Sequence, residues 1–149
     1  MDKLERIIFV GRSGTCREPM AMGILRDISH KEDIEVLARG LVVSFPEPMN
    51  GKAEAILISN GITLNDFTSQ ELSNDDITEG TLILTMERKQ KDKVLANFEN
   101  ANIEHVYVLT DFVGDELEII DPYGGSLQSY GLCYETLRKS IKKLLKILS

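Results

Sequence analysis

Short apolar runs alternate along the chain with longer segments in which apolar residues recur every three or four positions. The short runs predict strands and the longer segments predict helices, because these two periodicities match the two kinds of backbone. The predicted strands span 7–10, 34–38, 81–86 and 105–109, and the predicted helices span 19–29, 52–59, 87 to about 98, and about 126 to the end. This alternation indicates an α/β fold of three layers, with a four-stranded, mostly parallel sheet covered by helices on both faces.

The segments between these elements contain neither a repeat nor a low-complexity linker. Residues 44–51 hold two prolines and a glycine and are expected to form a loop. We therefore predict a single domain over residues 1–149, a length that allows a sizeable hydrophobic core.

The turn between the first predicted strand and the first predicted helix carries the candidate chemistry. The strand ends at Gly11, and small and polar residues then lead to Arg17 and to Pro19 at the start of the helix. Such a unit directs backbone N–H groups and a helix N-terminus at an anion, and a guanidinium can hold two phosphate oxygens. The predicted phosphate-binding residues are Arg12, Ser13, Gly14, Thr15, Cys16 and Arg17.

The composition of the chain restricts the classes of partner that it can bind. The chain has 17 basic and 24 acidic residues, and its net charge of −7 argues against nucleic acid or an anionic membrane as a partner. Cys16 and Cys133 are too far apart in sequence to suggest a disulfide framework or a metal site, so we expect neither metal nor cofactor. A charged N-terminus and the lack of a long apolar run predict a cytoplasmic protein without a signal peptide or a transmembrane helix.

Two stretches of the chain are similar to the signatures of a known family. One has the spacing V-x5-C-R-x-P-x-A from Val10 to Ala21, and the other, at residues 121–124, reads Asp-Pro-Tyr-Gly. They resemble V-C-x-G-N-x-C-R-S-P-x-A and D-P-[FY]-G of the low-molecular-weight protein tyrosine phosphatases. Weaker similarity at 38–40, 60–62 and 82–86 extends the resemblance over nearly the whole chain, and it implies the phosphotyrosine protein phosphatase I-like fold.

The same resemblance implies roles for individual residues. The nucleophilic cysteine of the family corresponds to Gly11, which has no side chain and supplies no thiolate to attack phosphorus. Arg17 corresponds to the phosphate clamp, and Asp121 to the general acid that protonates the leaving group and later activates water. Gly14 replaces the asparagine that braces the loop, and Glu18 replaces the serine that hydrogen-bonds the thiolate.

Several residues near these positions leave alternatives open. Cys16, which lies beside the clamp in sequence, is a weaker candidate for a substitute nucleophile. Asp121 also fits an ordinary turn, because every residue type in Asp-Pro-Tyr-Gly favours one. Tyr123 and Phe45 are candidates for the rim of the pocket, although each also fits plain packing. Thr15 is shared with relatives that resemble protein-arginine phosphatases and points to a phosphoarginine lineage.

Three functions follow from these residues. The favoured one is a pseudophosphatase that binds a phosphorylated protein or a small phosphate ligand without turnover. The second is an active phosphatase, acting on phosphotyrosine or phosphoarginine, that uses a displaced nucleophile such as Cys16 or direct attack by water. The third is a non-catalytic interaction module whose loop is closed by Glu18 pairing with Arg12 or Arg17.

Overall fold

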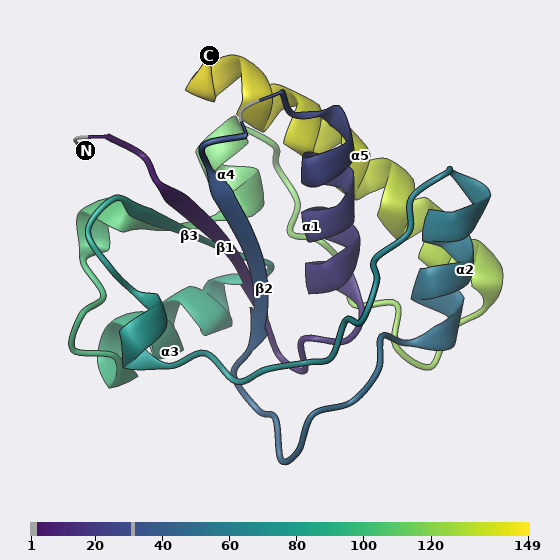
Figure 1. Ribbon diagram of the computed structural model, residues 1–149, viewed down its shortest axis with the longest axis horizontal. Coiled ribbons are helices and arrows are strands. Elements are labelled where there is room, and N and C mark those ends of the chain that lie inside the picture. The colour runs from purple at the N-terminus through teal and green to yellow at the C-terminus, as the bar shows by residue number, and fades with distance from the viewer. Residues whose placement is uncertain (1–2, 31) are drawn as a thin grey trace.

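The computed structural model describes residues 3–30 and 32–149 and is built around a sheet of four parallel strands (Figure 1). The strands are β1 (Arg6–Gly11), β2 (Glu35–Gly40), β3 (Thr81–Thr85) and β4 (Val106–Val108), in the order β2-β1-β3-β4. All four predicted strands are confirmed, with ends that differ by one or two residues. The last is shorter than predicted, because His105 ends a 3₁₀ turn and Leu109 already begins a helix.

Helices cover both faces of the sheet, as predicted (Figure 1). They are α1 (Arg17–Ile28), α2 (Gly51–Ser59), α3 (Arg88–Asn97), α4 (Leu109–Val113) and α5 (Leu127–Leu148), with 3₁₀ turns at Asn74–Asp76 and Ile103–His105. Helices α1, α2, α4 and α5 pack together on one face, and α3 packs on the other. The short helix α4 and the two 3₁₀ turns are absent from the sequence-based prediction, because each is too short to show a periodicity.

The first strand is buried on both faces, which explains why it reads as an unbroken apolar run. Ile7 and Phe9 point into the larger core under α1, α2 and α5. Ile8 and Val10 point into the smaller core under α3. This double burial fixes the strand in the centre of the sheet and therefore fixes the loop that follows it.

The order of the strands places that loop at a crevice. The chain leaves β1 through α1 to reach β2 on one side, whereas β3 pairs with β1 on the other side. The loops after β1 and β3 therefore open at the same edge of the sheet, at the point where the winding reverses. Ligands of open parallel sheets bind at such points, so the fold puts residues 11–17 where the sequence analysis expects an anion.

Some predictions concern absences or the chain ends. In the described part of the chain, no helix is long and apolar enough to cross a membrane. Within residues 3–30 and 32–149, no group of three or more histidine, cysteine or acidic side chains is placed to hold a metal ion. The prediction of no signal peptide rests partly on residues 1 and 2, which lie outside the described residues, as does residue 31. The single domain over residues 1–149 stays a prediction.

Candidate functional site

Two glycines allow the loop after β1 to fold tightly against the end of β2. Gly14 has a φ of 77°, in the left-handed region that favours glycine. At Gly40, the last residue of β2, a Cβ atom would lie 2.6 Å from the carbonyl carbon of Ser13. A side chain at Gly40 would therefore push the loop away from the sheet. In the sequence, Gly40 stands out only as part of the weak family similarity at 38–40.

The backbone carbonyls of the loop are held from outside. The N–H groups of Leu41 and Val42 donate to the carbonyl oxygen of Arg12 at 2.9 and 2.8 Å, and the N–H of Asn50 donates to that of Thr15 at 2.9 Å. The segment after β2 therefore ties down both ends of the loop. With those carbonyls facing outward, the loop offers donors to its interior, and the N–H of Gly14 is one of them.

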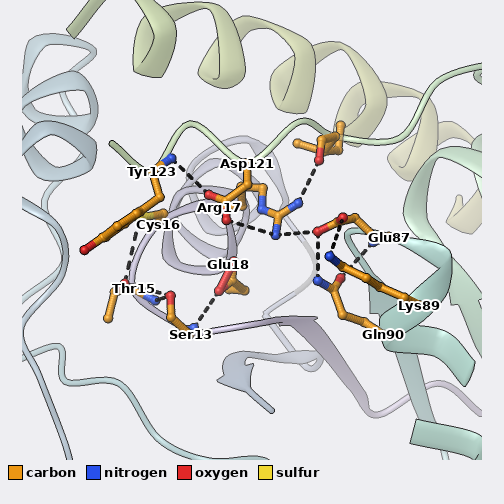
Figure 2. A network of polar contacts seen from close by, with 12 residues as sticks. Ser13, Thr15, Cys16, Arg17, Glu18, Glu87, Lys89, Gln90, Asp121 and Tyr123 are labelled. Carbon is orange, nitrogen blue, oxygen red and sulfur yellow. Dashed lines mark hydrogen bonds and ion pairs between the residues drawn. The ribbon is translucent and has the colours of Figure 1, made fainter. Parts of the chain in front are cut away.

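A carboxyl group fills the base of the loop (Figure 2). Glu18 lies in the first turn of α1, is only 1% exposed, and accepts a hydrogen bond of 2.6 Å from the N–H of Gly14. A Cβ atom at Gly11 would lie 2.5 Å from its Cδ and 2.6 and 2.9 Å from its two oxygens. The Glu18 carboxyl therefore occupies the space beside Gly11 that any larger side chain at that position would need.

Burial determines the acidity of this group. Loss of contact with water raises the pKa of Glu18 to about 7, although the charge of Arg17 and the backbone N–H groups of Glu18 and Gly14 act to lower it. The predicted pairing of Glu18 with Arg12 or Arg17 is wrong: in the described residues neither arginine forms an ion pair with Glu18. The loop is instead closed through the backbone of Gly14, because the guanidinium of Arg17 is engaged elsewhere.

Arg17 is almost completely buried, at 1% exposure, and joins three segments of the chain (Figure 2). Its Nη1 donates to the carbonyl oxygen of Ile119 at 2.7 Å. Its Nη2 lies 2.9 Å from Oε2 of Glu87 and 3.7 Å from Oδ2 of Asp121. Among the described residues its Nε is buried without a hydrogen-bond partner. The role of Arg17 as a phosphate clamp stays a prediction, and the buried Nε is a donor that an anion could use.

Glu87 is a site residue that the sequence analysis did not identify. It lies between β3 and α3, where its backbone N–H donates to Oε1 of Gln90 at 2.8 Å. Burial raises the pKa of Glu87, but the hydrogen bond and the charge of Arg17 outweigh it, so the pKa lies below its ordinary value. An acidic residue just after a buried strand, at the same sheet edge as the loop, was the available signal.

Asp121 takes part in a turn and also faces Arg17. Its Oδ1 accepts a hydrogen bond of 3.1 Å from the N–H of Tyr123, which is the interaction expected of a turn. Its Oδ2 faces Arg17, which is the place expected of a site residue. Tyr123 is 73% exposed on this segment, and Phe45, 64% exposed, lies on the segment between β2 and α2. Their assignment to the rim of the pocket stays a prediction.

Cys16 has the environment of a structural thiol. It is buried, and its Sγ lies 3.7 Å from the hydroxyl of Tyr130 and 3.8 Å from that of Thr15. Burial raises the pKa of the Cys16 thiol above its ordinary value, and the hydrogen bonds from Tyr130 and Thr15 offset this only in part. A thiolate is the reactive form of cysteine, so this environment disfavours Cys16 as a substitute nucleophile.

Comparisons with known proteins agree with this fold. The family described as "Low molecular weight phosphotyrosine protein phosphatase" matches residues 6–149. The low molecular weight protein-tyrosine-phosphatase PtpB of Staphylococcus aureus is 30% identical over 143 residues, covering 96% of this chain and 99% of PtpB. The protein-arginine-phosphatase of Bacillus subtilis is 31% identical over 145 residues, covering 94% of each chain. A solved structure of the YwlE arginine phosphatase superposes with a TM-score of 0.88 at 28% identity, covering 96% of this chain and 95% of that one. In that structure a serine replaces a cysteine of the active site and is phosphorylated.

Proposed function

The chain belongs to the low molecular weight phosphotyrosine protein phosphatase family, and we propose that within it the protein is a pseudophosphatase. It binds a phosphate group in the loop of residues 11–17, presented by a phosphorylated protein or by a small ligand, and does not turn it over. Homologues of this chain are named as tyrosine and arginine phosphatases, so both classes of phosphorylated residue are candidate ligands.

The observation that carries this proposal is the pairing of Gly11 with Glu18. The motif puts Gly11 at the position of the family's nucleophile, where it offers no lone pair to attack phosphorus. The space that a thiol would use is taken by the Glu18 carboxyl, which lies within 3 Å of a Cβ atom at Gly11. The two departures from the family pattern fit each other, because the Glu18 carboxyl in this position leaves no room for a Cβ atom at position 11.

The parts that recognise an anion are retained. The loop leads into the N-terminus of α1, which favours negative charge, and Arg17 keeps a buried Nε that lacks a partner among the described residues. Oδ2 of Asp121, the residue that the motif likens to the family's general acid, lies 3.7 Å from Nη2 of the guanidinium. A general acid without a nucleophile completes no covalent cycle, so the helix N-terminus and Arg17 support binding while Asp121 alone supports no turnover.

We expect the purified protein to release no 4-nitrophenol from 4-nitrophenyl phosphate above the background rate, and no phosphate from a phosphotyrosine or phosphoarginine protein. The matched control is Asp121→Asn, which removes the carboxyl group at the general acid position and is expected to give the same trace. Inorganic phosphate or vanadate should nevertheless raise the melting temperature, because a ligand of the folded state stabilises it. Turnover by the wild type that Asp121→Asn abolishes would contradict the proposal and would favour direct attack by water or a displaced nucleophile.

A further inference from the structure

The Glu18 carboxyl competes with any anion for the interior of the loop. It accepts a hydrogen bond of 2.6 Å from the N–H of Gly14, a loop donor that is then not available to an anion. It is 1% exposed, and the absence of a side chain at Gly11 leaves room for it on that side. An ionised Glu18 and an anion held in the same loop repel each other strongly, because little water screens them.

The charged groups around Glu18 compensate that repulsion only in part, because Arg17, whose charge acts to lower the pKa of Glu18, also faces two other carboxylates. On its own helix, Arg17 directs Nη2 at Glu87, from the start of α3, and at Asp121, from the segment before α5. Asp121 adds negative charge and acts to raise the pKa of Glu18. Two thiols also lie near Glu18: that of Cys16, and that of Cys133 on α5. Burial raises the pKa of both, that of Cys133 to about 12, so both are neutral at ordinary pH. The remaining way to neutralise Glu18 is to add a proton.

Resting on the phosphate site proposed above, we propose that Glu18 couples anion binding to proton uptake: an oxyanion binds together with one proton, which is shared between the Glu18 carboxyl and a ligand oxygen. In this equilibrium, one protein with an ionised Glu18, one proton and one ligand combine to form one complex. No bond other than that to the proton forms or breaks. The burial of Glu18, which raises its pKa to about 7, makes this proton available near neutral pH.

The coupling acts on phosphate monoesters and on sulfate alike. A phosphate monoester loses its second proton near pH 6, so above about pH 7 both ligands are almost fully ionised and each complex must take up one proton. The affinity for each is therefore expected to fall tenfold per pH unit in that range, and the ratio of the two affinities is expected to stay constant.

Sulfate is the cleanest probe, because its own charge is constant across the range. Isothermal titration calorimetry of sodium sulfate with the full chain should give an affinity that is constant below about pH 6 and falls tenfold per pH unit well above pH 7. The sign follows from the raised pKa: below it Glu18 is neutral and sulfate binds, and above it each binding event must take up a proton.

The matched variants are Glu18→Gln and Asp121→Asn. The amide introduced by Glu18→Gln keeps an oxygen for the N–H of Gly14 but never ionises, so the affinity of this variant for sulfate should be independent of pH and higher than that of the wild type at pH 8.5. Asp121→Asn removes a carboxylate that acts to raise the pKa of Glu18, so this variant should keep the tenfold slope of the wild type while the fall in affinity begins at a lower pH. An equal slope in the wild type and in Glu18→Gln would overturn the inference while leaving the phosphate site intact. Failure of phosphate and sulfate to bind any of the three proteins between pH 5.5 and 8.5 would overturn the proposed function itself.

Discussion

Replacing Gly11 with alanine is expected to lower the free energy of unfolding by about 3 kcal/mol, which is far more than a change of one methyl group usually costs in a strand. The added Cβ atom would lie 2.5 Å from Cδ of Glu18, so the carboxyl has to move. Because Glu18 is buried, moving it separates it from the N–H of Gly14 and leaves both groups without their partner. Urea unfolding at pH 7 measures the loss.

A double-mutant cycle separates this clash from a general intolerance of alanine. In a Glu18→Ser background the space beside Gly11 is free, and Gly11→Ala should then cost less than about 1 kcal/mol. The difference of about 2 kcal/mol is the coupling between the two positions, within the range seen for residues in contact. An equal cost in both backgrounds would show that Glu18 does not occupy that space.

The same clash limits any attempt to restore the thiolate. Gly11→Cys alone should recover little phosphatase activity, because its side chain meets the Glu18 carboxyl and because Gly14 also departs from the family pattern. The double variant Gly11→Cys with Glu18→Ser removes this obstruction, and its phosphatase activity should be compared with that of Gly11→Cys alone.

Replacing Arg17 with alanine is expected to be still more destabilising, by about 4 kcal/mol, because it removes one partner of a buried charge network. The Glu87 carboxylate and the carbonyl oxygen of Ile119 would lose donors at 2.9 and 2.7 Å, and Asp121 would lose the cation beside it. The variant should also lose any rise in melting temperature on adding phosphate. Urea unfolding and thermal melting with and without phosphate measure the two effects.

Lys89 provides the matched control for this variant. It also contacts Glu87, with Nζ at 3.5 Å from Oε1, but its side chain is 68% exposed. Exposed ion pairs contribute little, so Lys89→Ala should cost less than about 1 kcal/mol. A loss of similar size in both variants would mean that the burial of Arg17 does not set the strength of its contacts.

The fold was largely predictable because its signals are local. The unbroken apolar run of β1 and the alternation of strands and helices suffice for a parallel sheet with two covered faces, and the comparisons support the same family that the two motifs suggest. The elements that escaped prediction, such as α4 at Leu109–Val113, are single turns. The formation of α4 depends on its packing against α5, which no local pattern records.

The proximity of the candidate site residues was predictable, but their connections were not. The resemblance of the two motifs to one family suggested that Arg17 and Asp121 lie together, and their side chains are 3.7 Å apart. Glu18 was expected to close the loop, but through an arginine, because opposite charges are the obvious partners in a sequence. Its real partner is the N–H of Gly14. A sequence does not show which backbone N–H group a side chain will contact, because every residue type except proline carries one. Glu87, the nearer of the two carboxylates that face Arg17, was missed because it lies 70 residues away from it (87 − 17) and shares no motif with it.

The central claim is that a carboxyl group holds the base of the loop where the family places a thiolate. NMR detection of the amide proton of Gly14 through a pH titration tests it directly. We expect this resonance to titrate with a midpoint near pH 7, following the protonation of Glu18, and to stay constant in Glu18→Gln. A Gly14 amide that does not titrate in the wild type, or that titrates in the same way without the carboxyl group, would contradict the claim.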